Sequence, residues 1–374
     1  MSDNPLVLLN RTGQSVWFDN IRRGLLESGE LQRMVRAGEL RGVTSNPTIF
    51  ENAIARTEEY NSALHALSTK RYSPEQAYEH LALEDIRAAA DVFLPVYKES
   101  RGTDGFISLE VSPALALDPD ATWKEAGRLK RAVDRPNLMI KIPGTLACLD
   151  AIRRAIADGI HVNVTLLFSV ERYRNVMEAY AAGLEDRASR GLPLDAVSSV
   201  ASFFVSRLDT LIDRRLDRMD GDGHVRPEVL SALRGKAAIA NTRIAYQEFL
   251  AFRGSQRWLD LSARGARLQR PLWASTSTKD PSYPDIYYVE ALIALDSVNT
   301  MPPATLAAYR DHGKPAIRIG DDLGAARDLP GRLAEVGISL EQVTDQLERE
   351  GIEAFQRSFQ SLLSVVENRL SDKR

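Results

Sequence analysis

The chain has 374 residues, of which 44% are hydrophobic and 26% are charged, a composition typical of a globular protein with a substantial core. Its 48 Lys and Arg residues against 51 Asp and Glu residues leave a formal net charge of −3, so no strong attraction to nucleic acid or acidic membranes is expected. A disordered, collagen-like or membrane-spanning chain is excluded, because no uncharged apolar run approaches the ~20 residues of a transmembrane helix.

The N-terminal segment, the cysteine count and the histidine spacing bear on the compartment, on disulfides and on metal binding. Residues 1–14 lack the basic end and the apolar stretch of a signal peptide, so we expect a cytoplasmic protein. Cys148 is the only cysteine, which excludes an intramolecular disulfide framework. The five His residues form no pair at the spacing of a metal site, so no structural metal is expected.

Eight short apolar runs alternate along the chain with longer segments of helical periodicity. The runs lie at residues 15–19, 41–45, 106–110, 138–142, 161–165, 197–204, 271–275 and 297–301. Several are nearly continuous in Val, Ile, Leu and Phe, as in strands of a parallel sheet that is covered on both faces. Apolar residues at three- and four-residue spacing predict helices over 58–68, 74–100, 122–133, 169–188 and 234–255. This alternation indicates an α/β fold, a (β/α)8 TIM barrel with additional helices.

The surplus over the ~250 residues of a bare barrel predicts extra helices and loops within one domain that spans residues 1–374. We expect helical insertions at about 47–104 and 209–270, and a C-terminal helical segment at about 327–374. Within that segment, residues 340–370 predict one or two amphipathic helices that lie across the barrel. Residues 221–228 are expected to form a flexible loop.

Six of the apolar runs have a reactive or hydrogen-bonding side chain at, near or directly after their C-terminal end. These residues are Asp19, Asn46, Glu110, Lys141, Thr165 and Ser202. In a β/α barrel the C-terminal ends of the strands converge on one mouth, so the six side chains are expected to share one cavity.

Lys141 carries the sharpest chemical signal, because it interrupts an apolar strand, residues 138–142. Burial disfavours the charged ammonium, and a neutral amine attacks a ketone to form a Schiff base, which then accepts electrons during bond cleavage. The alternative is a lysine that merely reaches solvent or pairs with a carboxylate.

Asp19 and Glu110 are the carboxylates expected to flank this amine, one as the proton acceptor for a substrate hydroxyl and the other as a relay to water. A helix cap or turn is the alternative role for Asp19. Turn formation is likewise the alternative for Asn46, which precedes Pro47, and a backbone hydrogen bond is the alternative for Thr165.

Two later segments predict a phosphate site. Ser202 and Arg207 lie five residues apart where a strand turns into a helix, and residues 275–279 form a second turn rich in hydroxyl groups that ends in Lys279. A guanidinium, hydroxyls and free backbone N–H groups suit a phosphate dianion. The alternative is that Arg207 pairs with Asp209 or another acid.

Seven segments together resemble the transaldolase family, particularly its longer bacterial subgroup. They are VWFDN, GVTSNPTIF, ISLEVSP, LMIKIPGT, VNVTLLFS, ASFFVSRLD and LWASTSTKD. The resemblance implies a β/α barrel that acts through a lysine Schiff base without metal or organic cofactor, in the non-oxidative pentose phosphate pathway. It implies transfer of a dihydroxyacetone unit from sedoheptulose 7-phosphate to glyceraldehyde 3-phosphate, which yields erythrose 4-phosphate and fructose 6-phosphate.

The resemblance also implies roles for individual residues. It assigns the Schiff base to Lys141, the proton shuttle to Asp19, a bound catalytic water to Glu110 and Thr165, the substrate hydroxyls to Asn46, and the phosphate to Ser202 and Arg207. Many family members have an arginine two residues after the serine that matches Ser275. This chain has Ser277 there, so Lys279 is expected to supply the second cation.

Two rival functions are also compatible with the sequence. A fructose 6-phosphate aldolase would share Lys141 and Asp19 and release free dihydroxyacetone, but related aldolases tend to have tyrosine where this chain has Phe204. The remoter alternative is a non-catalytic barrel that binds sugar phosphates. Small-molecule sugar phosphates are the expected partners, and the chain is compatible with a monomer or a homodimer.

Overall fold

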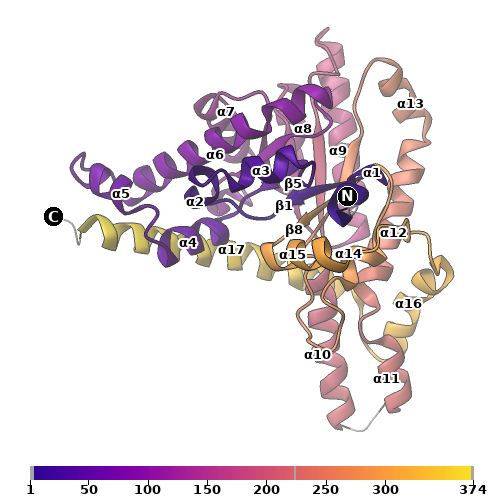
Figure 1. Ribbon diagram of the computed structural model, residues 1–374. Helices are drawn as coiled ribbons and strands as arrows, with labels where there is room; N and C mark the ends of the chain where they lie inside the picture. Colours follow the sequence, from indigo (N-terminus) through magenta and orange to yellow (C-terminus); the bar gives the residue numbers. More distant parts are fainter. Residues whose placement is uncertain (1–3, 223–224, 372–374) are drawn as a thin grey trace.

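The computed structural model describes residues 4–222 and 225–371, and in these ranges eight parallel strands close into a barrel (Figure 1). The strands are β1 (Gln14–Phe18), β2 (Gly42–Thr44), β3 (Phe106–Glu110), β4 (Leu138–Pro143), β5 (Val162–Leu167), β6 (Ser199–Phe204), β7 (Gln269–Ala274) and β8 (Ser297–Met301). Each neighbouring pair is parallel, and β8 closes the barrel by pairing with β1. The predicted (β/α)8 barrel is therefore confirmed, and each strand overlaps one of the predicted apolar runs.

Helices surround the barrel and continue beyond it. They are α1 (Pro5–Arg11), α2 (Arg23–Glu27), α3 (Glu30–Arg36), α4 (Pro47–Arg56), α5 (Asn61–Ser68), α6 (Pro74–Glu99), the 3₁₀ helix η1 (Pro113–Leu115), α7 (Pro119–Val133), α8 (Leu149–Ala157), α9 (Val170–Ser189), α10 (Ser206–Asp222), α11 (Pro227–Leu233), α12 (Ala237–Arg253), α13 (Gln256–Ala263), α14 (Tyr287–Ala291), α15 (Pro303–His312), α16 (Leu323–Glu335) and α17 (Leu340–Ser371). The five predicted helices correspond to α5, α6, α7, α9 and α12.

The extra helices occupy the segments where insertions are expected. Helices α4, α5 and α6 lie between β2 and β3, and α10 to α13 lie between β6 and β7. The C-terminal segment contains α16 and then α17, one continuous helix that runs alongside α4 in Figure 1. Part of the predicted loop at 221–228 is helical, because α10 extends to Asp222 and α11 begins at Pro227; residues 223–224 lie outside the described residues.

Local capping explains where several helices begin. Helix α6 starts with a capping box, in which the Ser73 side chain accepts from the Gln76 backbone and the Gln76 side chain accepts from the Ser73 backbone. Helix α7 begins three residues earlier than predicted, because the Asp118 side chain accepts a hydrogen bond from the Ala121 backbone N–H and Pro119 occupies the first turn.

Buried polar and aromatic side chains fill the N-terminal end of the barrel. Arg270, near the start of β7, forms an ion pair of 2.8 Å with Asp104 and donates to Ser15 Oγ at 2.8 Å. The Trp17 indole donates to the same Asp104 carboxylate and covers Gly42, where a Cβ would lie 2.6 Å from the ring. This packing leaves the C-terminal ends of the strands as the open mouth.

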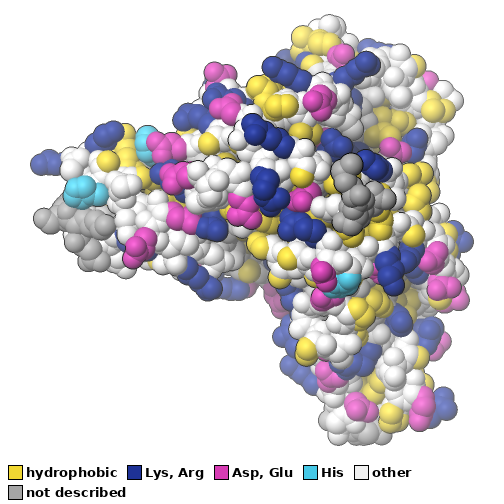
Figure 2. All heavy atoms as spheres, viewed as in Figure 1, with side chains coloured by type: hydrophobic (Ala, Val, Ile, Leu, Met, Phe, Trp, Pro, Cys, Tyr) yellow, Lys and Arg dark blue, Asp and Glu magenta, His cyan; other side chains and the backbone are white. Residues whose placement is uncertain are grey.

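The surface carries mixed charge. On the face shown in Figure 2, basic and acidic side chains are interspersed. The ion pairs of the described residues include several Arg–carboxylate pairs, such as Arg135 with Asp91 and Arg153 with Asp186. Across residues 4–222 and 225–371, no helix is both long and apolar enough to cross a membrane.

Candidate active site

The register of β3 and β4 brings Glu110 next to Lys141. The two residues are directly paired across the strands, and Lys141 Nζ lies 3.2 Å from Glu110 Oε2. The ammonium also donates to the Ser45 backbone carbonyl at 3.1 Å, and Lys141 is only 5% exposed. Lys141 therefore pairs with a carboxylate, as the alternative interpretation predicts, and it also lies at the barrel mouth.

Burial governs the ionisation of Glu110. Loss of hydration raises the pKa of this carboxyl above its usual value, Lys141 opposes the rise, and the negative charge of Asp19 adds to it. A carboxyl with a raised pKa beside an amine can exchange a proton with that amine or with a nearby water.

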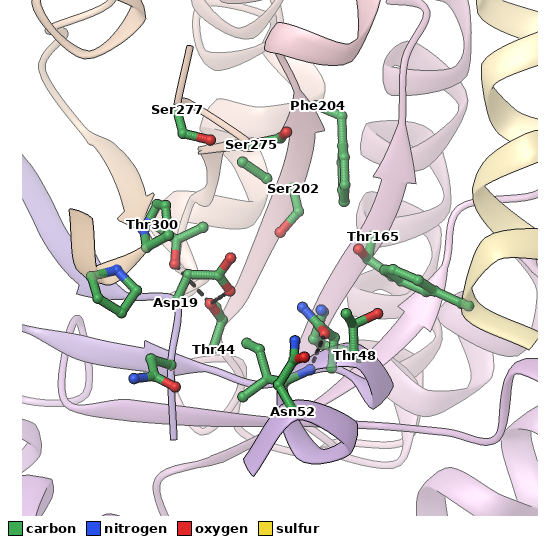
Figure 3. A pocket seen from close by; sticks show the side chains of 18 of the residues that line it. Asp19, Thr44, Thr48, Asn52, Thr165, Ser202, Phe204, Ser275, Ser277 and Thr300 are labelled. Atoms are coloured by element: carbon green, nitrogen blue, oxygen red, sulfur yellow. Dashed lines mark hydrogen bonds between the residues drawn. The ribbon is translucent and has the colours of Figure 1, made fainter. Parts of the chain in front are cut away.

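Asp19, which follows β1, is held by a chain of hydroxyl groups. Thr44 Oγ1 donates to Asp19 Oδ1 at 2.7 Å and lies 2.7 Å from Thr300 Oγ1 (Figure 3). The Asp19 backbone N–H donates to the Met301 carbonyl at 2.8 Å, so strands β2 and β8 together orient this carboxylate. The sequence interpretation missed Thr44 and Thr300; their signal is a hydroxyl near the C-terminal end of an otherwise apolar run.

Thr165 lies in an irregular part of β5. The next residue, Leu166, has a φ of +62°, and the pairing of β5 with β6 shifts register between Val164 and Leu167. Among the described residues, the buried Thr165 Oγ1 has no hydrogen-bond partner. A buried hydroxyl without a partner costs free energy, so this irregular segment presents an unused hydrogen-bonding group to the cavity.

Asn46 caps a helix and also lines the cavity. Its Oδ1 accepts from the Ile49 backbone N–H at 2.9 Å at the start of α4, so its structural role is a helix cap rather than the turn given as the alternative. Thr48 and Asn52, from the first turns of α4, lie along the same side of the cavity in Figure 3.

Ser202 belongs to a buried network inside the barrel. Its Oγ donates to Asn163 Oδ1 at 2.7 Å, and Asn163 Nδ2 donates to Ser108 Oγ at 3.1 Å. These bonds cross strands β6, β5 and β3, so Ser202 is fixed in position by the barrel interior.

Arg207 and Lys279 form a cationic region of the cavity. The Arg207 guanidinium lies 5.1 Å from the centre of the Phe204 ring, within cation–π distance. Burial lowers the pKa of both cations; the charge of Arg207 lowers the pKa of Lys279 further, and Asp19 opposes each shift. Lys279 Nζ donates to Ser277 Oγ at 2.8 Å. Two partly buried cations that repel each other favour a shared anionic ligand.

The alternative partner proposed for Arg207 is engaged elsewhere. Asp209 accepts from the Ala238 backbone N–H at 2.7 Å and from the Tyr288 hydroxyl at 3.0 Å. Burial raises the pKa of Asp209 from 3.8 to about 7. Across the described part of the chain, Arg207 forms no ion pair, so the alternative in which it pairs with an acid is wrong.

Ser275 lies between β7 and the turn that carries Lys279. Its φ of +57° is in the left-handed region, which is uncommon for a non-glycine residue. The Ser275 carbonyl accepts from the Ser206 backbone N–H at 3.0 Å, and the two hydroxyl oxygens are 3.1 Å apart. The turn after β7 is therefore joined to the start of α10, next to Arg207.

One cavity of about 580 Å³ brings these side chains together. Its walls include the predicted site residues Asp19, Asn46, Lys141, Thr165, Ser202, Phe204, Arg207, Ser275 and Lys279. Glu110 lines a neighbouring cavity of about 230 Å³ and contacts Lys141 from that side. The larger cavity is also lined by Arg22 and by Phe355 of α17, which the sequence interpretation did not assign to the site. An amine, two carboxylates and two cations in this arrangement suit a phosphorylated carbonyl compound.

Known proteins resemble this chain over nearly its whole length. A family model described as Transaldolase/Fructose-6-phosphate aldolase matches residues 16–366. The chain is 46% identical to a protein named Transaldolase from Trichodesmium erythraeum, over 99% of this chain and 98% of the relative. It is 47% identical to a Transaldolase from Thermobifida fusca, over 98% of this chain and 99% of the relative. A Transaldolase from Mycolicibacterium smegmatis is 44% identical over 99% of both chains.

Proposed function

The chain belongs to the transaldolase/fructose-6-phosphate aldolase family, and on this premise we propose that it is a transaldolase. It transfers a dihydroxyacetone unit from sedoheptulose 7-phosphate to glyceraldehyde 3-phosphate, and the products are erythrose 4-phosphate and fructose 6-phosphate. One observation carries the proposal: the buried Lys141 amine pairs with Glu110 at 3.2 Å and opens into a cavity that also contains Asp19, Arg207 and Lys279.

The first step is formation of a Schiff base on Lys141. Lys141 gives a proton to Glu110, and the neutral amine attacks the ketone carbon of the donor sugar. The hydroxyl of this adduct takes the proton back and leaves as one water, so a protonated imine joins Nζ to that carbon. Glu110 and Thr165 hold and activate this water in the proposed mechanism. The raised pKa of Glu110 and the unpartnered Thr165 hydroxyl, described above for residues 4–222 and 225–371, support that role.

The second step breaks the bond between carbons 3 and 4 of the donor. Asp19 takes the proton from the hydroxyl on carbon 4, a carbonyl forms there, and the electron pair of the broken bond moves through carbon 3 into the protonated imine. The aldose leaves, and dihydroxyacetone remains on Lys141 as an enamine until an acceptor aldehyde arrives. Thr44 donates to Oδ1 of Asp19, so Oδ2 is the proposed proton acceptor.

The remaining polar residues position the sugar phosphate. Arg207 and Lys279 bind the phosphate as charge-assisted donors, with the Ser202 and Ser275 hydroxyls nearby, and Asn46 contacts the substrate hydroxyls. This arrangement orients the ketone toward Lys141. After the aldose has left, the phosphate of the acceptor aldehyde binds at the same site.

Reductive trapping tests the proposal directly. Borohydride added with fructose 6-phosphate should reduce the imine, and peptide mass spectrometry should find the adduct on Lys141. Lys279→Met is the matched control, because it removes another lysine of the same cavity and should retain the adduct at saturating sugar. An adduct on a different lysine would refute the assignment, and the absence of any adduct would favour the non-catalytic binding barrel.

The rival aldolase function predicts a different product pattern. Phe204 has no hydroxyl to hold a water beside the enamine, which supports transfer over hydrolysis. Fructose 6-phosphate alone should therefore yield about one equivalent of glyceraldehyde 3-phosphate per site, and erythrose 4-phosphate should start continuous turnover. Rapid release of free dihydroxyacetone without an acceptor would favour the aldolase.

The proposed setting is the non-oxidative pentose phosphate pathway in the cytoplasm, with sugar phosphates as the partners. Charge supports small-molecule partners, since the net value of −3 provides no general attraction to nucleic acid.

A further inference from the structure

The C-terminal helix α17 is held by side-chain bonds to elements on both sides of the barrel mouth. On one side Arg172 of α9 forms an ion pair with Glu348 at 3.1 Å. On the other side Thr48 of α4 donates to Ser358 Oγ at 2.9 Å, and Ser361 donates to Glu51 at 2.6 Å. Helix α17 also packs against β5, η1 and α6 and runs alongside α4 in Figure 1, so it passes over the C-terminal end of β5, where Gly351 meets Leu166.

A glycine lets α17 approach the end of β5 closely. A Cβ at Gly351 would lie 3.1 Å from Leu166 Cδ2 and 3.6 Å from the Phe168 ring. Gly351 and Phe355 are four residues apart and therefore lie on the same face of the helix. The close approach at Gly351 thus directs Phe355 toward the strand ends that carry Thr165 and Lys141.

Phe355 covers the reactive amine. Its ring centre is 5.9 Å from Lys141 Nζ, it lines the 580 Å³ cavity, and it is only 5% exposed. A nonpolar ring at this distance offers no hydrogen bond to water and tolerates the positive charge of a protonated imine through its π face.

We propose that Phe355 determines how far this enzyme favours transfer over hydrolysis, by excluding water from the carbon bonded to Lys141 Nζ. This inference rests on the proposed transaldolase function. The competing reaction begins when the enamine takes a proton at carbon 3 and becomes a protonated imine. One water then adds to the imine carbon, the C–N bond breaks, and free dihydroxyacetone and the Lys141 amine are released.

Two substitutions of Phe355 test the inference, and a third substitution on the same helix serves as the control. Phe355→Leu reduces the cover while keeping an apolar side chain, and Phe355→Ala removes it. Phe359→Leu is the matched control: Phe359 lies one turn further along α17, faces Tyr78 with the ring centres 5.6 Å apart, and lines the smaller cavity. The measured quantity is the rate of dihydroxyacetone release from fructose 6-phosphate alone, divided by the rate of transfer to erythrose 4-phosphate.

The ratio should rise about tenfold or more in Phe355→Ala, rise less in Phe355→Leu, and stay within about twofold of the unmodified enzyme in Phe359→Leu. Thermal unfolding shows whether each variant is folded, and borohydride trapping shows whether Lys141 still forms the imine. A change in the ratio can then be distinguished from misfolding. An unchanged ratio in both Phe355 variants, or an equal rise in Phe359→Leu, would overturn the inference. Failure of the unmodified enzyme to form the Lys141 adduct would instead refute the proposed function.

Discussion

Replacing Lys141 by methionine separates the covalent chemistry of this residue from its role as the counter-ion of Glu110. Methionine retains an unbranched apolar side chain but has no amine, so it can form no imine. The Glu110 side chain is only 4% exposed and is paired with Lys141 at 3.2 Å. The variant therefore leaves a buried carboxylate without its cation, a change unrelated to catalysis.

The magnitude of this loss depends on pH. Lys141 opposes the burial that raises the pKa of Glu110, so its removal raises that pKa further. Truncating one member of a buried ion pair costs about 3–5 kcal/mol, but Glu110 can avoid part of this cost by taking up a proton. Proton uptake costs about 1.4 kcal/mol for each pH unit above the usual value of 4.5, which limits the loss to about 3.5 kcal/mol at pH 7.

Urea unfolding at pH 5 and pH 7.5 checks this reasoning. An acid whose pKa is raised in the folded state loses stability as pH rises, so Lys141→Met should be near the unmodified stability at pH 5 and clearly weaker at pH 7.5. Adding Glu110→Gln should remove the additional pH dependence that Lys141→Met introduces, without restoring borohydride trapping. Equal losses at both pH values, or no recovery in the double variant, would show that the Lys141–Glu110 pair does not determine stability here.

Three further predictions concern the carboxylates and the cations. Asp19→Asn should lower transfer by roughly 10²–10⁴, while the imine on Lys141 still forms and is trapped by borohydride; loss of the adduct would reverse the roles of Asp19 and Glu110. Arg207→Ala and Lys279→Ala should each raise KM for fructose 6-phosphate by about tenfold or more and spare unphosphorylated fructose, whereas equal losses on both sugars would indicate a structural role. Burial raises the pKa of Asp209 to about 7, so stability should fall as pH rises from about 4 to 7, and Asp209→Asn should flatten that profile in urea unfolding.

The barrel could be predicted because its strands and helices differ in period. Buried parallel strands read as continuous apolar runs, whereas the surrounding helices repeat every three or four residues. Helix boundaries depend on individual caps, so α7 begins at Pro119 rather than at residue 122. The C-terminal segment, predicted as one or two helices, forms the single helix α17. Glycine weakens a helix in isolation, but here Gly351 permits the close contact with Leu166.

The candidate site could be predicted only to the level of strand ends. Parallel strands end at one mouth, which brings Asp19, Lys141 and Ser202 to a common cavity. The pairing of Glu110 with Lys141 depends on the register of β3 and β4, which the two strand sequences do not specify. Phe355 could not be predicted, since only the path of α17 across the mouth brings it to the lysine.

Several site residues have a structural role and a proposed chemical role at once, and the two roles support each other. Asn46 caps α4 through Oδ1, and the cap fixes the side chain whose amide group is proposed to meet the substrate. Ser202 is fixed by Asn163, and Asp19 by Thr44, through bonds that exist before any ligand binds. Groups held in this way lose little conformational entropy when the substrate arrives, so more of the binding free energy is available to orient the ketone toward Lys141. The helix cap, the buried hydroxyl network and the ion pair are therefore part of how this barrel prepares its proposed site for catalysis, rather than alternatives to a catalytic function.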